Sequence, residues 1–155
     1  MAELNEGDIA PDFDLETDSG RIQLSELRGK LVVLYFYPKD DTPGCTKEAI
    51  GFSEKKAEFE ALGAAIVGVS KDSPASHRKF RAKYELELVL ASSPENAMLE
   101  SYGVWVEKNM YGRSYMGIDR ATFLIDREGR VRQSWRKVKV PGHVDAVLSA
   151  AKAIA

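Results

Sequence analysis

Residues 35–49 read Tyr35-Phe36-Tyr37-Pro38-Lys39-Asp40-Asp41-Thr42-Pro43-Gly44-Cys45-Thr46-Lys47-Glu48-Ala49, and they join the end of an apolar run to the start of a helix. The run at 30–37 is rich in Val, Leu and aromatic residues, which predicts a buried strand. Pro38 ends that strand because it cannot donate a ladder hydrogen bond, and Asp-Thr-Pro-Gly is typical of a tight turn. Apolar residues then recur at helical spacing over 46–62, which predicts a helix that Gly63 stops.

The turn carries Cys45, the single cysteine of the 155-residue chain. The first N–H groups of a helix lack intrahelical partners and carry partial positive charge, so we expect this thiol to ionise more readily than a free one. Because the thiolate is the nucleophile, Cys45 is a candidate catalytic residue. Thr42 can direct its hydroxyl to the same point, and Pro38 can wall the site against water. The alternative is that a lone cysteine is a small, inert, buried hydrophobe.

The pattern Pro38-x-x-x-Thr42-x-x-Cys45 resembles the active-site signature of peroxiredoxins. The longer string at 36–49 is similar to one branch of that family, the bacterioferritin-comigratory or PrxQ proteins. The resemblance covers most of the chain, since three further blocks match the family at residues 10–13, 68–74 and 120–126. It implies a thiol-dependent peroxidase that reduces hydrogen peroxide and organic hydroperoxides through a sulfenic acid on Cys45.

The same resemblance implies roles for the surrounding residues. Thr42 and Arg120 would be catalytic together with Cys45, and Pro38 and Gly44 would lie against the substrate. The backbone N–H groups around Gly44, the Thr42 hydroxyl and the Arg120 guanidinium would stabilise the negative charge that grows on the departing oxygen.

Two of these side chains have a plainer interpretation from the residues alone. Arg120 could form a surface ion pair with Asp119, its neighbour in the sequence. Glu48 could orient Arg120 from the first turns of the helix, or it could simply be an acidic residue near a helix N-terminus.

The chain departs from the PrxQ branch at its second cysteine. Many members carry a resolving cysteine five residues after the first, where this chain has Ile50, and others carry it in the helix expected at 74–84. With one cysteine no intramolecular disulfide can form, so we expect an external thiol to recycle the enzyme: thioredoxin, glutaredoxin with glutathione, or a small thiol. Overoxidation to the sulfinic acid is expected at high peroxide. A monomer is the usual form in the branch, and a dimer is left open.

Rival functions use the same fold differently. A disulfide oxidoreductase of the thioredoxin type needs Cys-x-x-Cys, and Thr42 stands where its first cysteine would be, which excludes dithiol exchange. A redox sensor or binding module would use Cys45 without significant turnover. Peroxide consumption with dithiothreitol, wild type against Cys45→Ser, distinguishes the sensor from the peroxidase.

Composition places the chain among ordinary single-domain proteins, with residues 1–155 forming one domain. A net charge of −2 with mixed signs gives no reason to expect nucleic-acid or membrane binding. The acidic N-terminus lacks an apolar signal segment, so the cytoplasm is the expected location. We expect no cofactor and no metal, because the two histidines, His77 and His143, and one cysteine form no ligand cluster in the sequence. His77 is expected to be half-exposed on its helix.

The order of the elements predicts an α/β, thioredoxin-like fold with an N-terminal β-hairpin extension and a central mixed sheet flanked by helices. The hairpin is expected at 9–24. Further strands are expected at 64–70, 86–91, 120–126 and 130–137, and helices at 74–84, 95–102 and 143–155. Residues 103–119 form either a packed loop or β-extension over the core, or a loop that lines a substrate or partner surface. Sites of such sheets lie at the carboxyl ends of the strands, where Cys45 falls.

Overall fold

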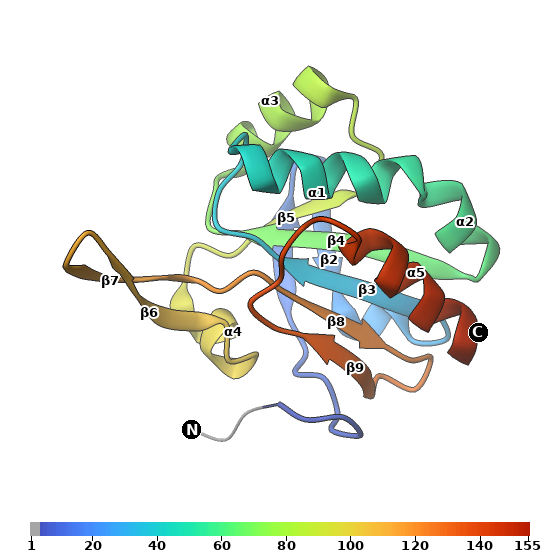
Figure 1. Cartoon of the computed structure of the whole chain (residues 1–155). Coiled ribbons are helices and arrows are strands. Elements are labelled where there is room, and N and C mark those ends of the chain that lie inside the picture. Colours follow the sequence, from blue (N-terminus) through green and yellow to red (C-terminus); the bar gives the residue numbers. More distant parts are fainter. Residues whose placement is uncertain (1–3) are drawn as a thin grey trace.

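The computed structural model describes residues 4–155, so the first three residues of the acidic N-terminus lie outside it (Figure 1). In chain order the strands are β1 (Asp14–Thr17), β2 (Gly20–Gln23), β3 (Leu31–Phe36), β4 (Ala64–Ser70), β5 (Val89–Ser92), β6 (Trp105–Met110), β7 (Arg113–Ile118), β8 (Ala121–Ile125) and β9 (Val131–Trp135). The helices are the 3-10 turn η1 (Leu24–Leu27), α1 (Pro43–Glu54), α2 (Lys56–Ala61), α3 (Pro74–Tyr84), α4 (Asn96–Ser101) and α5 (His143–Ile154).

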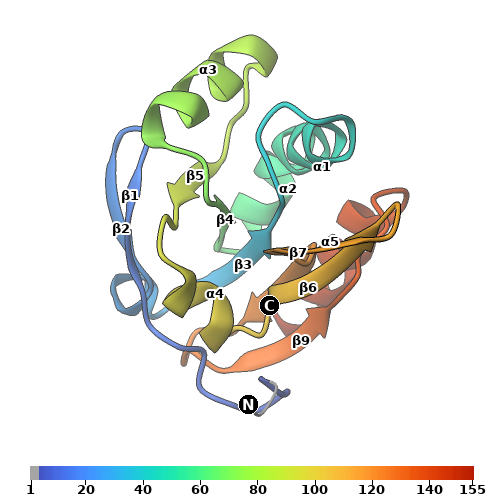
Figure 2. The same cartoon turned by 90° about the vertical axis from the view of Figure 1, so that its left-hand side faces the viewer.

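Seven strands form one mixed sheet in the order β2-β1-β5-β4-β3-β8-β9. Strand β3 lies inside it, parallel to β4 and antiparallel to β8. The hairpin of β1 and β2 attaches to one edge through β5, and β9 forms the other edge (Figure 2). The predicted mixed sheet with flanking helices and an N-terminal hairpin is therefore confirmed.

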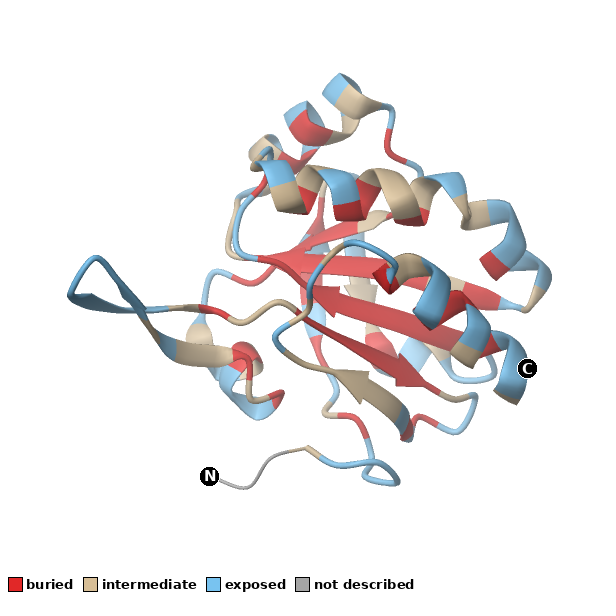
Figure 3. Cartoon of the chain, viewed as in Figure 1, coloured by how far each residue is buried: buried red, intermediate tan, exposed pale blue. Residues whose placement is uncertain are grey.

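Every residue of β3 is buried because both faces of the sheet are covered (Figure 3). On one face Val33 and Tyr35 pack with residues of α1, α2 and α5, among them Phe52 and Phe59. On the other face the alternate side chains of β3 pack with Leu99 of α4 and with the N-terminal segment. The end of β3 is thus held rigidly from both sides, and the turn that carries Cys45 begins there.

The predicted helix over 46–62 is wrong in two respects. Helix α1 already begins at Pro43, whose fixed φ angle and missing N–H suit the first helical position. The helix is also broken at Lys55, whose N–H is shared between the carbonyls of Gly51 and Phe52. Phe59 lies in α2, after the interruption, and is buried in the core.

The strand predicted at 86–91 begins only at Val89. The guanidinium of Arg81 takes the carbonyls of Leu86 and Leu88 as acceptors, at 2.7 and 2.5 Å, so these groups bond to a side chain rather than to a neighbouring strand. His77 is a further correction: it was expected to be half-exposed, but it is fully buried on the inner face of α3.

Residues 103–119 form a two-stranded hairpin of β6 and β7 that stands away from the main sheet (Figure 1). The β-extension is confirmed, but its packing over the core is wrong. Ile118 is buried where β7 meets the body, whereas the far end carries exposed apolar side chains: Met110, Tyr111, Tyr115 and Met116. This hairpin leads into Arg120 through Asp119.

Among the described residues, no helix combines the length and the apolar character that a bilayer crossing requires.

The pairing of β3 with β4 generates the first prediction. Gly68 lies opposite Tyr35, and a Cβ at Gly68 would come within 2.7 Å of the Tyr35 Cζ atom. The Tyr35 ring is fully buried and stacks on Phe52 with 4.7 Å between ring centroids, so it has no free space to move into. We expect Gly68→Ala to lower the free energy of unfolding by about 1–3 kcal/mol, measured by urea denaturation.

Gly117→Ala is the matched control on another strand. Its added Cβ would meet the flexible Lys108 side chain at 3.3 Å, so we expect a change within about 0.5 kcal/mol. Equal losses in the two variants would contradict the packing argument.

Candidate active site

Cys45 is the third residue of α1, directly after the turn that follows β3. Thr42 is the N-cap in an extended conformation, and the first helical hydrogen bond runs from the Thr46 N–H to the Thr42 carbonyl at 2.8 Å. The sulfur therefore lies in the first helical turn, where backbone N–H groups favour an anion. The strand, turn and helix expected from the sequence have this order in the structure.

Arg120 bridges the sulfur and a buried carboxylate. Its Nη2 donates to the Cys45 Sγ at 3.3 Å, and its Nη1 donates to the Glu48 Oε1 at 2.8 Å. Arg120 immediately precedes β8, whose first residue Ala121 pairs with Phe36 at the end of β3. That pairing brings together residues 75 positions apart. The ion pair of Arg120 is thus made with Glu48, and the interpretation as a surface pair with Asp119 does not describe this geometry.

Burial shapes the charges of this group. Burial raises the pKa of Glu48 to about 7, although the Arg120 charge and hydrogen bond oppose the rise. Burial lowers the pKa of Arg120, but the charges of Glu48 and Cys45 outweigh that effect and raise it above its ordinary value. The guanidinium therefore remains charged at neutral pH, in a site where little water screens it from the sulfur.

A histidine that the sequence did not single out for this site lies on the far side of Glu48. The His143 Nε2 is 3.9 Å from the Glu48 Oε2, an atom with no hydrogen-bond partner among the described residues. Burial and the Arg120 charge lower the pKa of His143 to about 4, so its ring is neutral near pH 7. Its Nε2 is hydrogen-bonded to the Thr122 hydroxyl at 2.8 Å. Only the packing of α5 against β8 could reveal this neighbour.

Gly44 has a steric reason to be glycine. A Cβ at this position would lie 3.1 Å from the Arg120 Nη2 and 4.0 Å from the Val140 Cγ2. The missing side chain leaves the guanidinium free to approach the sulfur. Cys45 itself is 1% exposed, so little water reaches the sulfur beside the guanidinium.

Thr42 and Pro38 are placed differently from expectation. The Thr42 hydroxyl donates to the Lys39 carbonyl at 2.8 Å and so closes the turn. A hydrogen bond from that hydroxyl to the Cys45 sulfur is not among the contacts of residues 4–155. Pro38 is exposed on the turn, whereas the sequence predicted a wall of the site.

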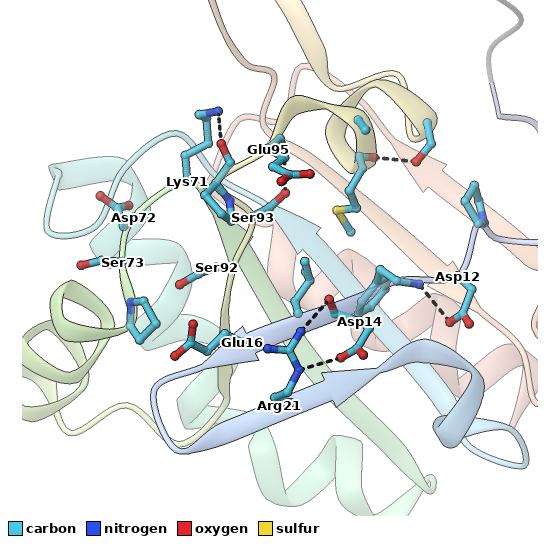
Figure 4. Close-up of a pocket in the computed structure, with 18 residues that line it drawn as sticks. Asp12, Asp14, Glu16, Arg21, Lys71, Asp72, Ser73, Ser92, Ser93 and Glu95 are labelled. Carbon is cyan, nitrogen blue, oxygen red and sulfur yellow. Dashed lines mark hydrogen bonds and ion pairs between the residues drawn. The ribbon is translucent and has the colours of Figure 1, made fainter.

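A pocket of about 730 Å³ lies apart from these residues, between β1, the end of β5 and the start of α3 (Figure 4). Carboxylates of Asp12, Asp14 and Glu16 line it from the N-terminal hairpin, and Asp72 and Ser73 line it from the loop before α3. None of the predicted site residues is in its lining.

Cys45, Arg120 and Glu48 together form one group, the Cys45 group. This group can hold a thiolate and stabilise a second anion beside it, because the Arg120 guanidinium and the free N–H groups at the start of α1 point at the same place. Within the described part of the chain there is one thiol, and no group of three or more His, Cys, Asp or Glu side chains that could hold a metal ion.

Comparison with known proteins gives consistent matches. A sequence model of the AhpC/TSA family matches residues 7–134. Peroxiredoxin Bcp of Bacillus subtilis is 48% identical over 147 residues, which are 94% of this chain and 94% of that protein. Peroxiredoxin Bcp of Xanthomonas campestris is 50% identical over 147 residues, or 93% and 92% of the two chains. A solved structure of Xanthomonas campestris bacterioferritin comigratory protein, studied for alkyl peroxide reduction, has a TM-score of 0.89 at 45% identity and covers 99% of this chain and 98% of that one.

The buried carboxylate generates a prediction about stability and pH. Between pH 4.5 and about 7 the folded protein keeps the Glu48 proton that the unfolded chain releases. The contribution of Glu48 to stability therefore falls as pH rises through this range, by up to about 3 kcal/mol at about 1.4 kcal/mol per pH unit. We expect the free energy of unfolding of wild type to decline over this range relative to that of Glu48→Gln, measured by denaturant titration.

Glu58→Gln serves as the control, because Glu58 is an exposed partner of Lys55. It should keep the wild-type pH dependence, and a constant difference between wild type and Glu48→Gln would refute the prediction.

Proposed function

Since this chain belongs to the AhpC/TSA family and is a peroxiredoxin of the Bcp, or PrxQ, branch, we propose that Cys45 is the sulfur that attacks the peroxide and Arg120 its principal partner. The fold of these relatives is the thioredoxin-like fold expected from the sequence. The observation that carries the proposal is the 3.3 Å contact between the Arg120 Nη2 and the Cys45 Sγ.

In the first step a lone pair of the Cys45 thiolate attacks one oxygen of the hydroperoxide. The S–O bond forms while the O–O bond breaks, and the departing alkoxide or hydroxide takes a proton to leave as alcohol or water. Cys45 is oxidised to the sulfenic acid. Arg120 has two functions in this step, because its charge favours the thiolate before attack and the leaving oxygen during it.

In the second step an external thiol reduces the sulfenic acid. Its sulfur bonds to the Cys45 sulfur and water leaves, which gives a mixed disulfide. A second thiol then opens this disulfide and restores Cys45. One hydroperoxide and two thiols thus become one alcohol, one water and one disulfide, and the external thiols supply both electrons.

The single cysteine of the chain supports a one-cysteine cycle with thioredoxin, glutaredoxin with glutathione, or a small thiol as donor. Comparing turnover with thioredoxin against glutaredoxin plus glutathione identifies the donor. We keep the monomer as the predicted form. The cytoplasm stays the predicted location, because recycling by external thiols needs a compartment that keeps thiols reduced.

The proposal predicts distinct losses in two variants, measured as peroxide consumption with dithiothreitol as donor. Cys45→Ser should reduce consumption to the uncatalysed background, because no thiolate remains. Arg120→Gln should lower the rate constant about 10²–10³-fold, the usual cost of removing one charge-stabilising donor from an active site.

Arg132→Gln is the control, since Arg132 is an exposed arginine near Asp126, outside the Cys45 group. It should retain the wild-type rate. A redox sensor would behave otherwise, consuming one equivalent of peroxide for each protein and then stopping; that result, with folded wild type and reduced donor, would reject the peroxidase cycle.

The lack of a second thiol predicts overoxidation. The Cys45 sulfenic acid waits for an external thiol, so at high peroxide a second oxidation competes and gives the sulfinic acid. Mass spectrometry after graded peroxide should show two added oxygens on Cys45, rising with peroxide and falling as dithiothreitol is increased. Absence of this species at all peroxide levels would count against an exclusively external reductant.

A further inference from the structure

The turn that presents Cys45 is held from outside by α3, which lies beside the start of α1 (Figure 1). Two neighbouring aspartates of the turn make the contacts. Asp40 bonds to the first residues of α3 in a buried position, and Asp41 bonds to the last residues of α3 at the surface. None of these contacts has a part in the chemistry described above.

The carboxylate of Asp40 is surrounded by donors. The Tyr37 hydroxyl donates to its Oδ1 at 2.6 Å, and the Ser76 hydroxyl donates to its Oδ2 at 2.8 Å. The His77 Nδ1 lies 2.8 Å from the same Oδ2. His77 is 0% exposed and Asp40 is 7% exposed, so water does not compete with these bonds.

The partner of the second ring nitrogen of His77, Nε2, shows which atoms of His77 and Asp40 carry hydrogens. Its Nε2 lies 3.1 Å from the Ala91 carbonyl, which can only accept, so Nε2 carries a hydrogen. One more proton must lie between Nδ1 and Asp40. Burial raises the pKa of Asp40, but the hydrogen bonds from His77 and Tyr37 outweigh it and hold the pKa below its ordinary value. Asp40 is therefore the carboxylate, and His77 carries both N–H groups.

The surroundings contain a second carboxylate but no other cation in contact. The Asp72 Oδ2 accepts from the Asp40 N–H at 2.8 Å and from the Ser70 hydroxyl at 2.7 Å. The remaining groups that face His77 are the Tyr37 hydroxyl, at 3.4 Å, and the Ala91 carbonyl. Among the described residues, the imidazolium is thus the cation that compensates Asp40 in this buried cluster.

The outer contact is weaker. Asp41 has a φ of +58°, in the left-handed region that is strained for a residue other than glycine. Its carboxylate accepts from the Lys83 Nζ at 2.8 Å and the Tyr84 hydroxyl at 2.5 Å. These groups are exposed, and exposed ion pairs contribute little. The buried contact between His77 and Asp40 therefore contributes more to fixing the turn than the exposed contacts of Asp41 do.

We propose that His77 is a positioning residue for peroxide reduction, which as a buried imidazolium fixes Asp40 and so the turn that leads into Cys45. This inference rests on the proposed function of Cys45. His77 acts through the backbone of residues 40–42, which sets where α1 begins and how its first turn faces Arg120. Misplacement of reacting groups by a fraction of an ångström to 1 Å costs up to about 10²-fold in rate.

The first test concerns the protons alone and needs no turnover. The chain has two histidines, so ring signals in ¹H–¹⁵N NMR can be assigned with His77→Gln. At about pH 7 we expect the His77 ring to show two N–H groups and the His143 ring to be neutral. A single N–H on His77 would overturn the proposal, whatever the peroxidase assays show.

The second test measures oxidation of Cys45 by peroxide in a single turnover. We expect His77→Gln to lower the rate constant about tenfold or more. The Gln amide is uncharged and carries both N–H donors on one nitrogen, whereas Asp40 and the Ala91 carbonyl lie at different ring nitrogens of His77. Lys83→Gln breaks only the exposed contact and should stay within about twofold of wild type. Urea denaturation confirms that each variant is folded under the assay conditions.

Comparing the rate with the stability separates positioning from mere stabilisation. We expect His77→Gln to oxidise Cys45 more slowly than wild type under conditions where both proteins are fully folded. A folded His77→Gln with the wild-type rate refutes the proposal.

If His77→Gln does not fold, Ser76→Ala takes its place, since it removes one donor to Asp40 and keeps the charge pair. It should then slow Cys45 oxidation less than tenfold but measurably, and a wild-type rate in that variant contradicts the proposal. A wild-type protein that fails to react with peroxide would instead reject the proposed function, and the NMR result would still stand.

Discussion

The contact between the Arg120 guanidinium and the Cys45 sulfur is the interaction on which the rest of this structure depends. It requires a strand that ends at the right place, a helix that begins two residues before the thiol, and a second strand that places the arginine beside both. Burial makes the contact strong, because a charge–charge interaction weakens when water screens it. Glu48 then fixes the orientation of the guanidinium from one helical turn further along α1.

Two sets of contacts restrain the pair of Arg120 and Cys45. On the side of the sheet, Glu48 and His143 connect Arg120 to α5, and their burial keeps His143 neutral while Arg120 stays charged. On the side of the turn, α3 holds Asp40 and Asp41. The first set of contacts orients the guanidinium beside the sulfur and the second restrains the turn before it, so a site with one nucleophile depends on elements from along the whole chain.

Local patterns explain why much of the fold could be predicted. Apolar runs bounded by turn residues located the strands, and the proline and glycine near Cys45 located the start of a helix. The errors come from contacts that a local pattern does not contain. Arg81 donates to two carbonyls of a predicted strand, and the predicted helix is interrupted at Lys55, whose N–H is shared between two carbonyls. His77 was expected at the surface because its acceptors, on Asp40 and Ala91, are 37 and 14 residues away.

The sequence by itself determined the nucleophile and its place between strand and helix, since these follow from residue types within fifteen consecutive positions. It also pointed to Arg120, but only through resemblance to a family; the residues alone allowed a surface pair with Asp119. The tertiary structure decided that Arg120 contacts the sulfur, that Glu48 keeps a raised pKa and that His77 is buried beside Asp40. Each of these depends on burial and on pairing between strands distant in the chain, which together set the energy of a charge and appear only when the sheet has formed.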